Sequence, residues 1–245
     1  MDDWFNRIQE QYKLPSNTAY ELHEKGFVVL QNTVDPQKLP HLVAAYDAAV
    51  VAANPHDVGI GRSDTRVHDF VNRGPHFDDF YIQPQLLAAS CAAIGQPFKL
   101  SSMHSRTVRP GAKAQALHVD FPRDAAGWPM VGFIIMMDEF RNENGATRFV
   151  PGSHCWPQVP DDVTAAKPTE DCDGQVLACG PAGSVIIYNG SIWHGYSANQ
   201  TDQPRRSIQG AYIRRTAQSW INQADRIRPD TLDRIGDLAK YLLDL

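Results

Sequence analysis

The stretch from residue 97 to 214 restricts the fold more than any other part of the chain, because it predicts many short strands separated by turns. Turn-forming pairs such as Pro110-Gly111 and Asn144-Gly145 divide the apolar segments. The predicted strands are Lys99–Val108, Ala114–Asp120, Val131–Met137, Thr147–Val150, Gln175–Ala178, Gly183–Tyr188, Tyr196–Ala198 and Arg205–Arg214. This pattern predicts a mainly β protein with flanking helices, built as a cupin-like jelly roll, that is, a double-stranded β-helix.

Helical patterns lie on both sides of this β region. Apolar residues at helical spacing predict helices at 16–25, 35–50, 83–94 and 230–243. Residues 54–75 show no periodicity, and they are predicted to form a long loop near an opening of the fold. A length of 245 residues fits a single domain. Its predicted parts are a mostly helical N-terminal part (1–96), a β-barrel core (97–215) and a C-terminal helix (216–245).

The composition narrows the classes of partner and of compartment. A net charge of -5 argues against nucleic acid as a partner. The acidic first residues do not resemble a signal peptide, and no apolar run approaches the roughly 20 residues that span a bilayer. The four cysteines have no Cys-x-x-Cys spacing, so a zinc finger or redox dithiol is not indicated. We therefore predict a cytoplasmic protein without a membrane or nucleic-acid partner.

A His-x-Asp pair and one distant histidine predict a metal site. In an extended chain, residues i and i+2 point the same way, so His118 and Asp120 can converge on one point. His194 follows a second strand-like run and can supply a third ligand. Two histidines and a carboxylate on one face of a metal, with the opposite positions open, are typical of non-haem Fe(II) oxygenases. His154, which follows a Pro-Gly-Ser turn, is the competing candidate for the distal ligand.

Arg205 and Ser207 predict a carboxylate receptor inside the barrel. They share one face of a predicted strand, while Arg206 lies on the other face. A buried guanidinium is tolerable when an anion pairs with it, and arginine binds a carboxylate through two parallel hydrogen bonds. The anion could be a dicarboxylic co-substrate whose other end chelates the metal. A register slip of one residue would exchange the faces and make Arg206 the anchor instead.

The order and spacing of these motifs resemble the phytanoyl-CoA dioxygenase family of Fe(II)/2-oxoglutarate oxygenases. The resemblance is carried by His118-x-Asp120, the segment 144–154, His194, Arg205 eleven residues later, and an N-terminal segment at 22–30. It implies Fe(II) held by the two histidines and Asp120, with 2-oxoglutarate between the iron and Arg205. The implied reaction consumes O2, releases succinate and CO2, and oxidises a small-molecule substrate.

The resemblance also implies roles for other residues. Gln115 is expected to contact 2-oxoglutarate with Arg205 and Ser207, because family members often place a polar residue there. In halogenating relatives alanine or glycine replaces the carboxylate, so Asp120 favours hydroxylation or a related oxidation. From the residues alone, Trp128, His104 and Arg106 are candidate substrate contacts. For Trp128 a packing role at the rim is an equal alternative, and either face of the strand carrying His104 and Arg106 could line the cavity.

Three hypotheses of function follow from the sequence. The first is an Fe(II)/2-oxoglutarate-dependent dioxygenase. The second keeps the metal barrel as a cupin-like, non-oxidative isomerase or hydrolase with another divalent ion. The third is a sensor that binds metal and 2-oxoglutarate without turnover. The Arg205 and Ser207 pair favours the first hypothesis, because a plain cupin does not need a buried carboxylate receptor.

Overall fold

The computed structural model describes residues 3–158, 160 and 171–245. Its helices are α1 (Asp3–Gln11), α2 (Ser16–Lys25), α3 (Leu39–Val51), α4 (Pro84–Ile94), α6 (Pro229–Arg234) and α7 (Asp237–Leu242). Its strands are β1 (Phe27–Leu30), β2 (Val58–Ile60), β3 (Asp64–Val67), β4 (Phe98–Val108), β5 (Met130–Met136), β6 (Thr147–Phe149), β7 (Val176–Ala178), β8 (Val185–Asn189), β9 (His194–Tyr196) and β10 (Arg205–Arg214). None of the helices in these residues combines the length and apolar character needed to cross a membrane.

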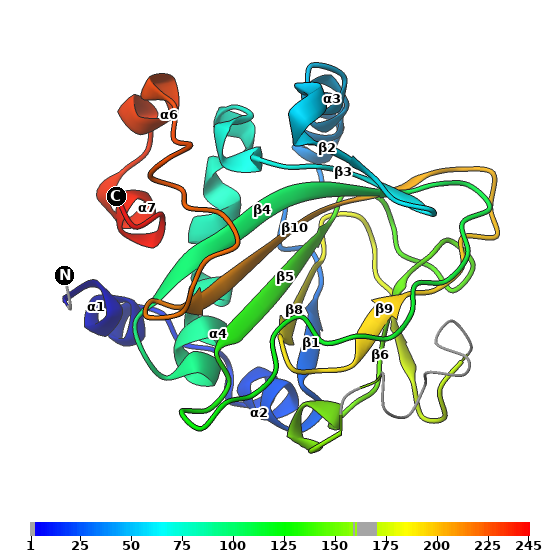
Figure 1. Cartoon of the computed structure of the whole chain (residues 1–245), viewed down its shortest axis with the longest axis horizontal. Coiled ribbons are helices and arrows are strands. Elements are labelled where there is room, and N and C mark those ends of the chain that lie inside the picture. Colours follow the sequence, from blue (N-terminus) through cyan, green and yellow to red (C-terminus); the bar gives the residue numbers. More distant parts are fainter. Residues whose placement is uncertain (1–2, 159, 161–170) are drawn as a thin grey trace.

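Two antiparallel sheets form the centre of the molecule. The large sheet has the order β1-β8-β5-β10-β4-β3-β2, and the small sheet has the order β7-β6-β9. Figure 1 shows the large sheet running across the molecule, with the small sheet beyond one side of it and the helices around the other side. The predicted mainly β jelly roll with flanking helices is confirmed. Crossovers between the sheets bring residues from distant parts of the chain to the space between them.

The alternation of side chains along the central strands divides the core into two layers. In β5, Phe133 and Ile135 belong to the core beneath the helices, whereas Ile134 and Met136 belong to the core between the sheets. Between the sheets, Phe27 of β1 stacks on Phe149 of β6 with ring centroids 4.4 Å apart. Successive side chains of a strand point to opposite faces of the large sheet. Those on one face therefore pack against the helices, and those on the other line the space between the two sheets.

Two predictions for the β region are wrong. Residues 54–75 are not a loop, because they contain the β2–β3 hairpin, which extends the large sheet beside β4. These strands are three and four residues long and carry Gly, Asp and Arg, so their sequence lacks a clear period of two. The segment 114–120 is not a strand either, since its only bridge joins His118 to His194. Single hydrogen bonds hold it against residues 190–196 instead of a continuous ladder.

The helical predictions hold at 16–25 and 83–94 and fail at the C-terminus. Gly26 takes a left-handed conformation and ends α2, as its position predicts. The predicted C-terminal helix is divided into α6 and α7, because Ile235 is extended between them and Gly236 precedes the second helix. Helix α1 is an addition that the sequence did not indicate. The C-terminal residues Leu242 and Leu243 are buried in the main core, so this end of the chain packs on the barrel.

Replacing Gly132 of β5 with alanine is expected to destabilise the fold. A Cβ atom there would lie 2.2 Å from Cζ of Tyr188, which is paired opposite Gly132 in β8. Overpacking of this kind costs about 1–3 kcal/mol of unfolding free energy, which urea denaturation would measure. Gly236→Ala is the control, since a Cβ there meets no atom within 4 Å and φ is −83°. Equal stability of the Gly132→Ala variant and the unsubstituted protein would contradict the expectation.

Candidate metal centre and active site

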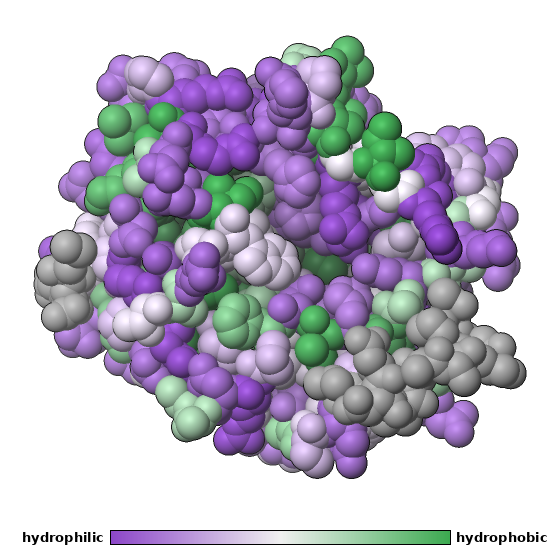
Figure 2. All heavy atoms as spheres, in the orientation of Figure 1, coloured by the Kyte–Doolittle hydropathy of each residue, from purple (hydrophilic) through white to green (hydrophobic). Residues whose placement is uncertain are grey.

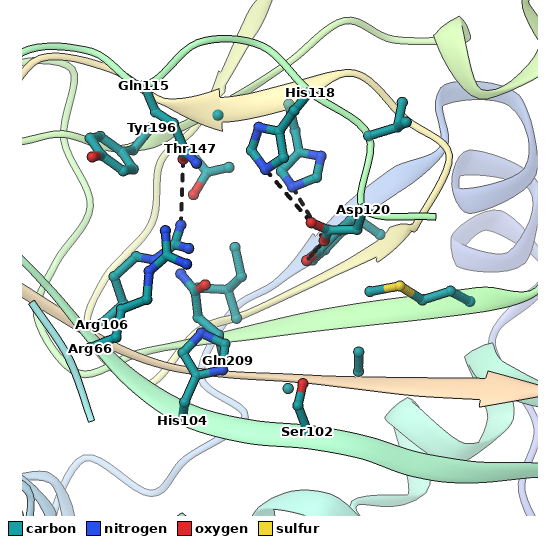
Figure 3. Close-up of a pocket in the computed structure, with 18 of the residues that line it drawn as sticks. Arg66, Ser102, His104, Arg106, Gln115, His118, Asp120, Thr147, Tyr196 and Gln209 are labelled. Atoms are coloured by element: carbon teal, nitrogen blue, oxygen red, sulfur yellow. Dashed lines mark hydrogen bonds and ion pairs between the residues drawn. The ribbon is translucent and has the colours of Figure 1, made fainter. Parts of the chain in front are cut away.

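Three of the predicted residues meet at one point between the sheets. One ligand atom from each of His118, Asp120 and His194 can be chosen so that all three lie within 4.8 Å of one another. Nε2 of His118 lies 3.6 Å from Oδ1 of Asp120, and Nε2 of His194 lies 3.5 Å from Oδ2. Figure 3 shows the imidazole of His118 directed toward the carboxylate of Asp120. In the part of the chain that the structure describes, this is the one group of three or more His, Cys, Asp or Glu side chains with metal-site geometry.

Backbone hydrogen bonds between the two segments hold this arrangement. The amide of His118 donates to the carbonyl of His194, and the amide of His194 donates to the carbonyl of His118, each at 3.0 Å. The amide of Asp120 donates to the carbonyl of Gly190 at 2.9 Å. The two imidazole rings consequently lie with their centroids 4.4 Å apart. The site is therefore assembled by pairing the segment after β4 with the start of β9.

The second nitrogen of each imidazole contacts a backbone carbonyl. Nδ1 of His118 lies 3.1 Å from the carbonyl oxygen of Ala116, and Nδ1 of His194 lies 2.9 Å from that of Ile192. A carbonyl only accepts, so each Nδ1 carries a proton and each Nε2 is the nitrogen directed toward Asp120. Carbonyl partners of this kind orient histidine ligands in metal sites. Two imidazoles and one carboxylate on one side of a point fit a divalent transition metal such as Fe(II).

The protonation states agree with this donor set. Burial would raise the pKa of Asp120, but the adjacent imidazoles of His194 and His118 and the hydroxyl of Tyr188 outweigh it and hold that pKa well below its usual range. Burial and the neighbouring His194 lower the pKa of His118 to about 4. At neutral pH the carboxylate is therefore ionised and the His118 imidazole is neutral, which are the forms that bind metal.

Tyr188 of β8 is a functional residue that the sequence analysis missed. Its hydroxyl donates a 2.7 Å hydrogen bond to Oδ2 of Asp120, and Gly132 leaves room for its ring. Burial and the nearby Asp120 raise the pKa of Tyr188 well above its usual value, so the phenol remains a donor. Its polar end within the apolar run of β8 was the one signal that could have indicated it.

Tyr188→Phe is expected to weaken Fe(II) binding while preserving the fold. Phenylalanine fills the same space, but Asp120 loses the hydrogen bond that orients it, and such changes cost roughly 10- to 100-fold in metal affinity. Fe(II) titration under anaerobic conditions with saturating 2-oxoglutarate would measure the loss. Tyr212→Phe is the matched control, because it also removes a buried hydroxyl with a 2.7 Å hydrogen bond, to Tyr81, outside the cavity. Equal affinities in the two variants would exclude this role for Tyr188.

The three residues line a cavity of about 330 Å³ that also contains Arg205. Figure 2 shows the molecular face hollowed near its middle, where Figure 1 places the space between β10 and β9. Arg205 is 1% exposed and donates to the carbonyl of Gly145 at 2.7 Å, while its Nε has no hydrogen bond among the described residues. Burial and the neighbouring charge of Arg106 lower its pKa to about 9. An entering anion would relieve this unfavourable buried charge.

The structure places Arg205 in the cavity and Arg206 outside it. Arg206 points away from the cavity and forms ion pairs with Asp138 and Asp47, both at 2.7 Å. Ser207 is buried behind Arg205 and accepts a 3.2 Å hydrogen bond from it, so it holds the guanidinium without lining the cavity. The strand register predicted from the sequence therefore matches the structure.

The remaining predicted residues divide into two groups. Gln115, His104 and Arg106 line the cavity, and Nη1 of Arg106 lies 3.4 Å from Oε1 of Gln115. Trp128 does not line it. Its indole donates to the carbonyl of His154 at 3.3 Å and lines a separate cavity of about 230 Å³ together with His23. The geometry therefore favours the packing role for Trp128.

His154, the competing candidate for the distal ligand, lies outside the metal centre. Nε2 of His154 lies 2.9 Å from the carbonyl oxygen of His23, and the residue does not belong to the metal-site group. Sequence reasoning also missed other cavity residues. Arg66, Thr147 and Tyr196 come from strands of three or four residues, where no pattern marked them, and Gln209 lies on the long central strand β10.

A comparison with known protein families shows which family this chain belongs to. The model of the phytanoyl-CoA dioxygenase (PhyH) family matches residues 22–207, which include the metal-site group, Arg205 and Ser207. The chain belongs to the phytanoyl-CoA dioxygenase family. Members of this family that carry a His-x-Asp and distal His triad are Fe(II)/2-oxoglutarate-dependent dioxygenases, and the geometry of His118, Asp120 and His194 agrees with that chemistry.

Several fungal dioxygenases are similar to this PhyH-family chain. Dioxygenase olcK of Penicillium canescens is 35% identical over 231 residues, which cover 80% of this chain and 73% of olcK. Multifunctional dioxygenase prhA of Penicillium brasilianum is 28% identical, covering 78% of this chain and 70% of prhA. Dioxygenase cdmA of Talaromyces verruculosus is 34% identical over 142 residues, which span 55% of this chain and only 40% of cdmA.

Solved structures share the fold. HygX from Streptomyces hygroscopicus, with nickel and 2-oxoglutarate bound, superposes with a TM-score of 0.70 at 16% identity, covering 85% of this chain and 90% of HygX. The epimerase SnoN, in complex with Fe3+, alpha ketoglutarate and nogalamycin RO, has a TM-score of 0.68 at 21% identity, covering 87% of this chain and 90% of SnoN. Both likenesses support the double-stranded β-helix.

Proposed function

We propose that this chain is an Fe(II)- and 2-oxoglutarate-dependent dioxygenase that oxidises a small organic molecule and releases succinate and CO2. The observation that carries the proposal is the presence of two receptors in one cavity. His118, Asp120 and His194 form one receptor, and the buried Arg205 forms the other. A dicarboxylate with a keto group beside one carboxylate matches this pair, because it can chelate a metal and place its far carboxylate on a guanidinium.

Each residue of the cavity has a role in this proposal. The two imidazoles and the Asp120 carboxylate would hold Fe(II) and leave the opposite coordination positions open. Arg205, held by Ser207 and the carbonyl of Gly145, would bind the far carboxylate of 2-oxoglutarate. Gln115 lines the same cavity and is proposed to add a polar contact. When bound, iron and 2-oxoglutarate supply the oxidising chemistry with O2.

We further propose hydroxylation or a related oxidation over halogenation. The carboxylate of Asp120 occupies the position at which halogenating members of the family carry alanine or glycine. HygX and SnoN have been crystallised with the small molecules hygromycin B and nogalamycin RO, and a small-molecule substrate is proposed for this chain by analogy. We infer that residues 1–245 act as one oxygenase domain, since β1–β3 complete the large sheet and α7 packs on it. The cytoplasmic location stays a prediction.

The test combines binding and turnover. Purified protein with Fe(II) and 2-oxoglutarate, without oxygen, should show the weak visible charge-transfer band of a metal-bound 2-oxo acid. Air and a substrate should then give succinate in proportion to oxidised product. No band would contradict the proposal and favour the cupin-like enzyme. A band without any substrate-dependent succinate across a broad panel of small molecules would favour the sensor.

A further inference from the structure

The wall of the cavity formed by β4 and β10 changes character along its length. The two strands pair with Arg106 opposite Ser207, His104 opposite Gln209, and Ser102 opposite Ala211. Figure 3 shows Arg106 toward one end of this wall and Ser102 toward the other, with His104 and Gln209 between them. The wall therefore runs from a cationic end, through a neutral polar pair, to an end with small side chains.

The cationic end and the end with small side chains are too far apart to serve one small ligand. Ala211 lies six positions after Arg205 in β10, and a strand rises about 3.3 Å per residue, so their backbones lie roughly 20 Å apart. In the proposed function, 2-oxoglutarate occupies only the part between the metal and Arg205. The part beside Ser102 and Ala211 is therefore left for the molecule that is oxidised.

Two side chains between the two ends of the cavity wall carry a polar atom without a hydrogen-bond partner in the described part of the chain. Nε2 of His104 is buried and has no hydrogen-bond partner among the described residues. Burial and the positive charge of Arg106 hold the pKa of His104 well below its usual value, so the imidazole is neutral. Gln209 donates from Nε2 to Oγ of Ser207 at 3.3 Å, and its side-chain carbonyl oxygen has no hydrogen bond among the described residues. Together they offer a donor and an acceptor to one oxygen-bearing group of a ligand.

An exposed indole lies at the rim of the same space. Trp220 lines the cavity although it is 61% exposed. Its backbone amide donates to the hydroxyl of Ser101 at 3.1 Å, which fixes this part of the loop after β10 beside the end with small side chains. A large aromatic surface left in water at a cavity rim provides a face for stacking against a ring.

The charge of the cavity argues against a cationic ligand. Arg66, Arg106 and Arg205 all line it, and Arg66 and Arg106 share the single carboxylate of Asp64, at 3.0 Å and 3.2 Å from their Nε atoms. The carboxylate of Asp120 is committed to the metal centre in the proposed function. An ammonium group entering this cavity would therefore meet a positive potential.

We propose that the substrate is an uncharged ring compound with a hydroxyl or carbonyl oxygen, which lies between Trp220 and the Ser102–Ala211 end and is oriented by His104 and Gln209. This proposal rests on the proposed function and names its substrate class. His104 and Gln209 are positioning residues, because they direct one carbon of the ring toward the metal without taking part in the oxidation.

Three ten-carbon probes test the proposal: 2-decalone, 2-aminodecalin and 2-decanone. Each is titrated into the anaerobic complex of the protein with Fe(II) and 2-oxoglutarate, and tryptophan fluorescence reports binding. Succinate release in air reports stimulation of turnover. We expect 2-decalone to half-saturate at a concentration at least about tenfold lower than the cyclic amine or the open-chain ketone, because it alone combines a ring, a carbonyl and no charge.

Single substitutions distinguish a role in positioning the ligand from a general loss of protein structure. His104→Ala is expected to raise the half-saturating concentration of 2-decalone about fivefold, and His104→Gln to restore most of the response, because glutamine again supplies a donor and an acceptor. Trp220→Ala is expected to raise it about tenfold and Trp220→Phe to restore part of the response. Trp156→Ala is the matched control, since Trp156 is 47% exposed and lines a different cavity. The distribution of oxidised products should also change in His104→Ala.

The outcomes distinguish this proposal from the proposed function. If the charge-transfer band is missing, the proposed function fails and this proposal fails with it. If the band is present, a stronger response to 2-aminodecalin, equal responses to the three probes, or no response to 2-decalone would overturn this proposal alone. Equal effects of Trp220→Ala and Trp156→Ala would likewise overturn it.

Discussion

Replacing His194 with alanine is expected to abolish the Fe(II)–2-oxoglutarate charge-transfer band and substrate-dependent succinate formation. The substitution removes one of three ligand atoms, and Asp120 loses the neighbour that lies 3.5 Å from its carboxylate. Changing only an outer partner of a ligand costs roughly 10- to 100-fold in metal affinity, so loss of the ligand itself should exceed about 100-fold. Anaerobic Fe(II) titration and a succinate assay would measure both effects.

His154→Gln is the matched control for this substitution. His154 was the competing candidate for the distal ligand, but its Nε2 faces the carbonyl oxygen of His23 at 2.9 Å, and glutamine can donate to the same carbonyl. We expect the band and the Fe(II) affinity to remain within about twofold of the unsubstituted protein, in keeping with a structural hydrogen bond. Loss of the band in His154→Gln and its retention in His194→Ala would reverse the assignment of the distal ligand.

Arg205→Met is expected to weaken 2-oxoglutarate binding by at least about 30-fold while leaving Fe(II) binding intact. Removing one partner of a buried, hydrogen-bonded charge pair costs about 2–5 kcal/mol, and each 1.4 kcal/mol is a factor of ten in affinity. Methionine keeps much of the side-chain volume beside Phe140, whose ring centroid lies 4.1 Å from the guanidinium carbon. Titration of the charge-transfer band with 2-oxoglutarate at saturating Fe(II) gives the dissociation constant.

The adjacent Arg206→Met provides the control for charge and for strand position. Arg206 points out of the cavity, so 2-oxoglutarate affinity should stay within about twofold. Stability should fall by about 1–3 kcal/mol instead, because the variant breaks charged hydrogen bonds to the partly buried Asp138. Thermal unfolding of both variants would distinguish lost affinity from lost structure. A larger loss of 2-oxoglutarate affinity in Arg206→Met than in Arg205→Met would show that the wrong arginine had been assigned.

Short sequence patterns were enough to predict those structural features that depend only on residues close together in the chain. The alternation in β10 separated Arg205 from Arg206, and Gly26 marked the end of α2. The spacing of His118 and Asp120 was enough to predict that their side chains meet, even though the segment is not a regular strand. In each case the relevant geometry spans only a few residues, and backbone dihedral preferences and side-chain direction suffice to predict it.

Contacts between segments that are far apart in the sequence could not be predicted from such short patterns. The hydrogen bond from Tyr188 to Asp120 joins residues 68 positions apart, and the β2–β3 hairpin acquires its strand character by pairing with β4. The sequence likewise left open whether Trp128 packs or contacts substrate, and it did not indicate that Trp220 lies at the rim of the cavity.

The sequence by itself therefore determined the jelly-roll class, the convergence of the His-x-Asp pair, and the alternation that puts Arg205 and Arg206 on opposite faces of one strand, because period, turn residues and residue type encode them locally. Only the tertiary structure decided which polar groups surround the metal site and which side chains face the remaining cavity. The physical reason is that closing two sheets on each other brings together side chains whose separation along the chain carries no information about their separation in space.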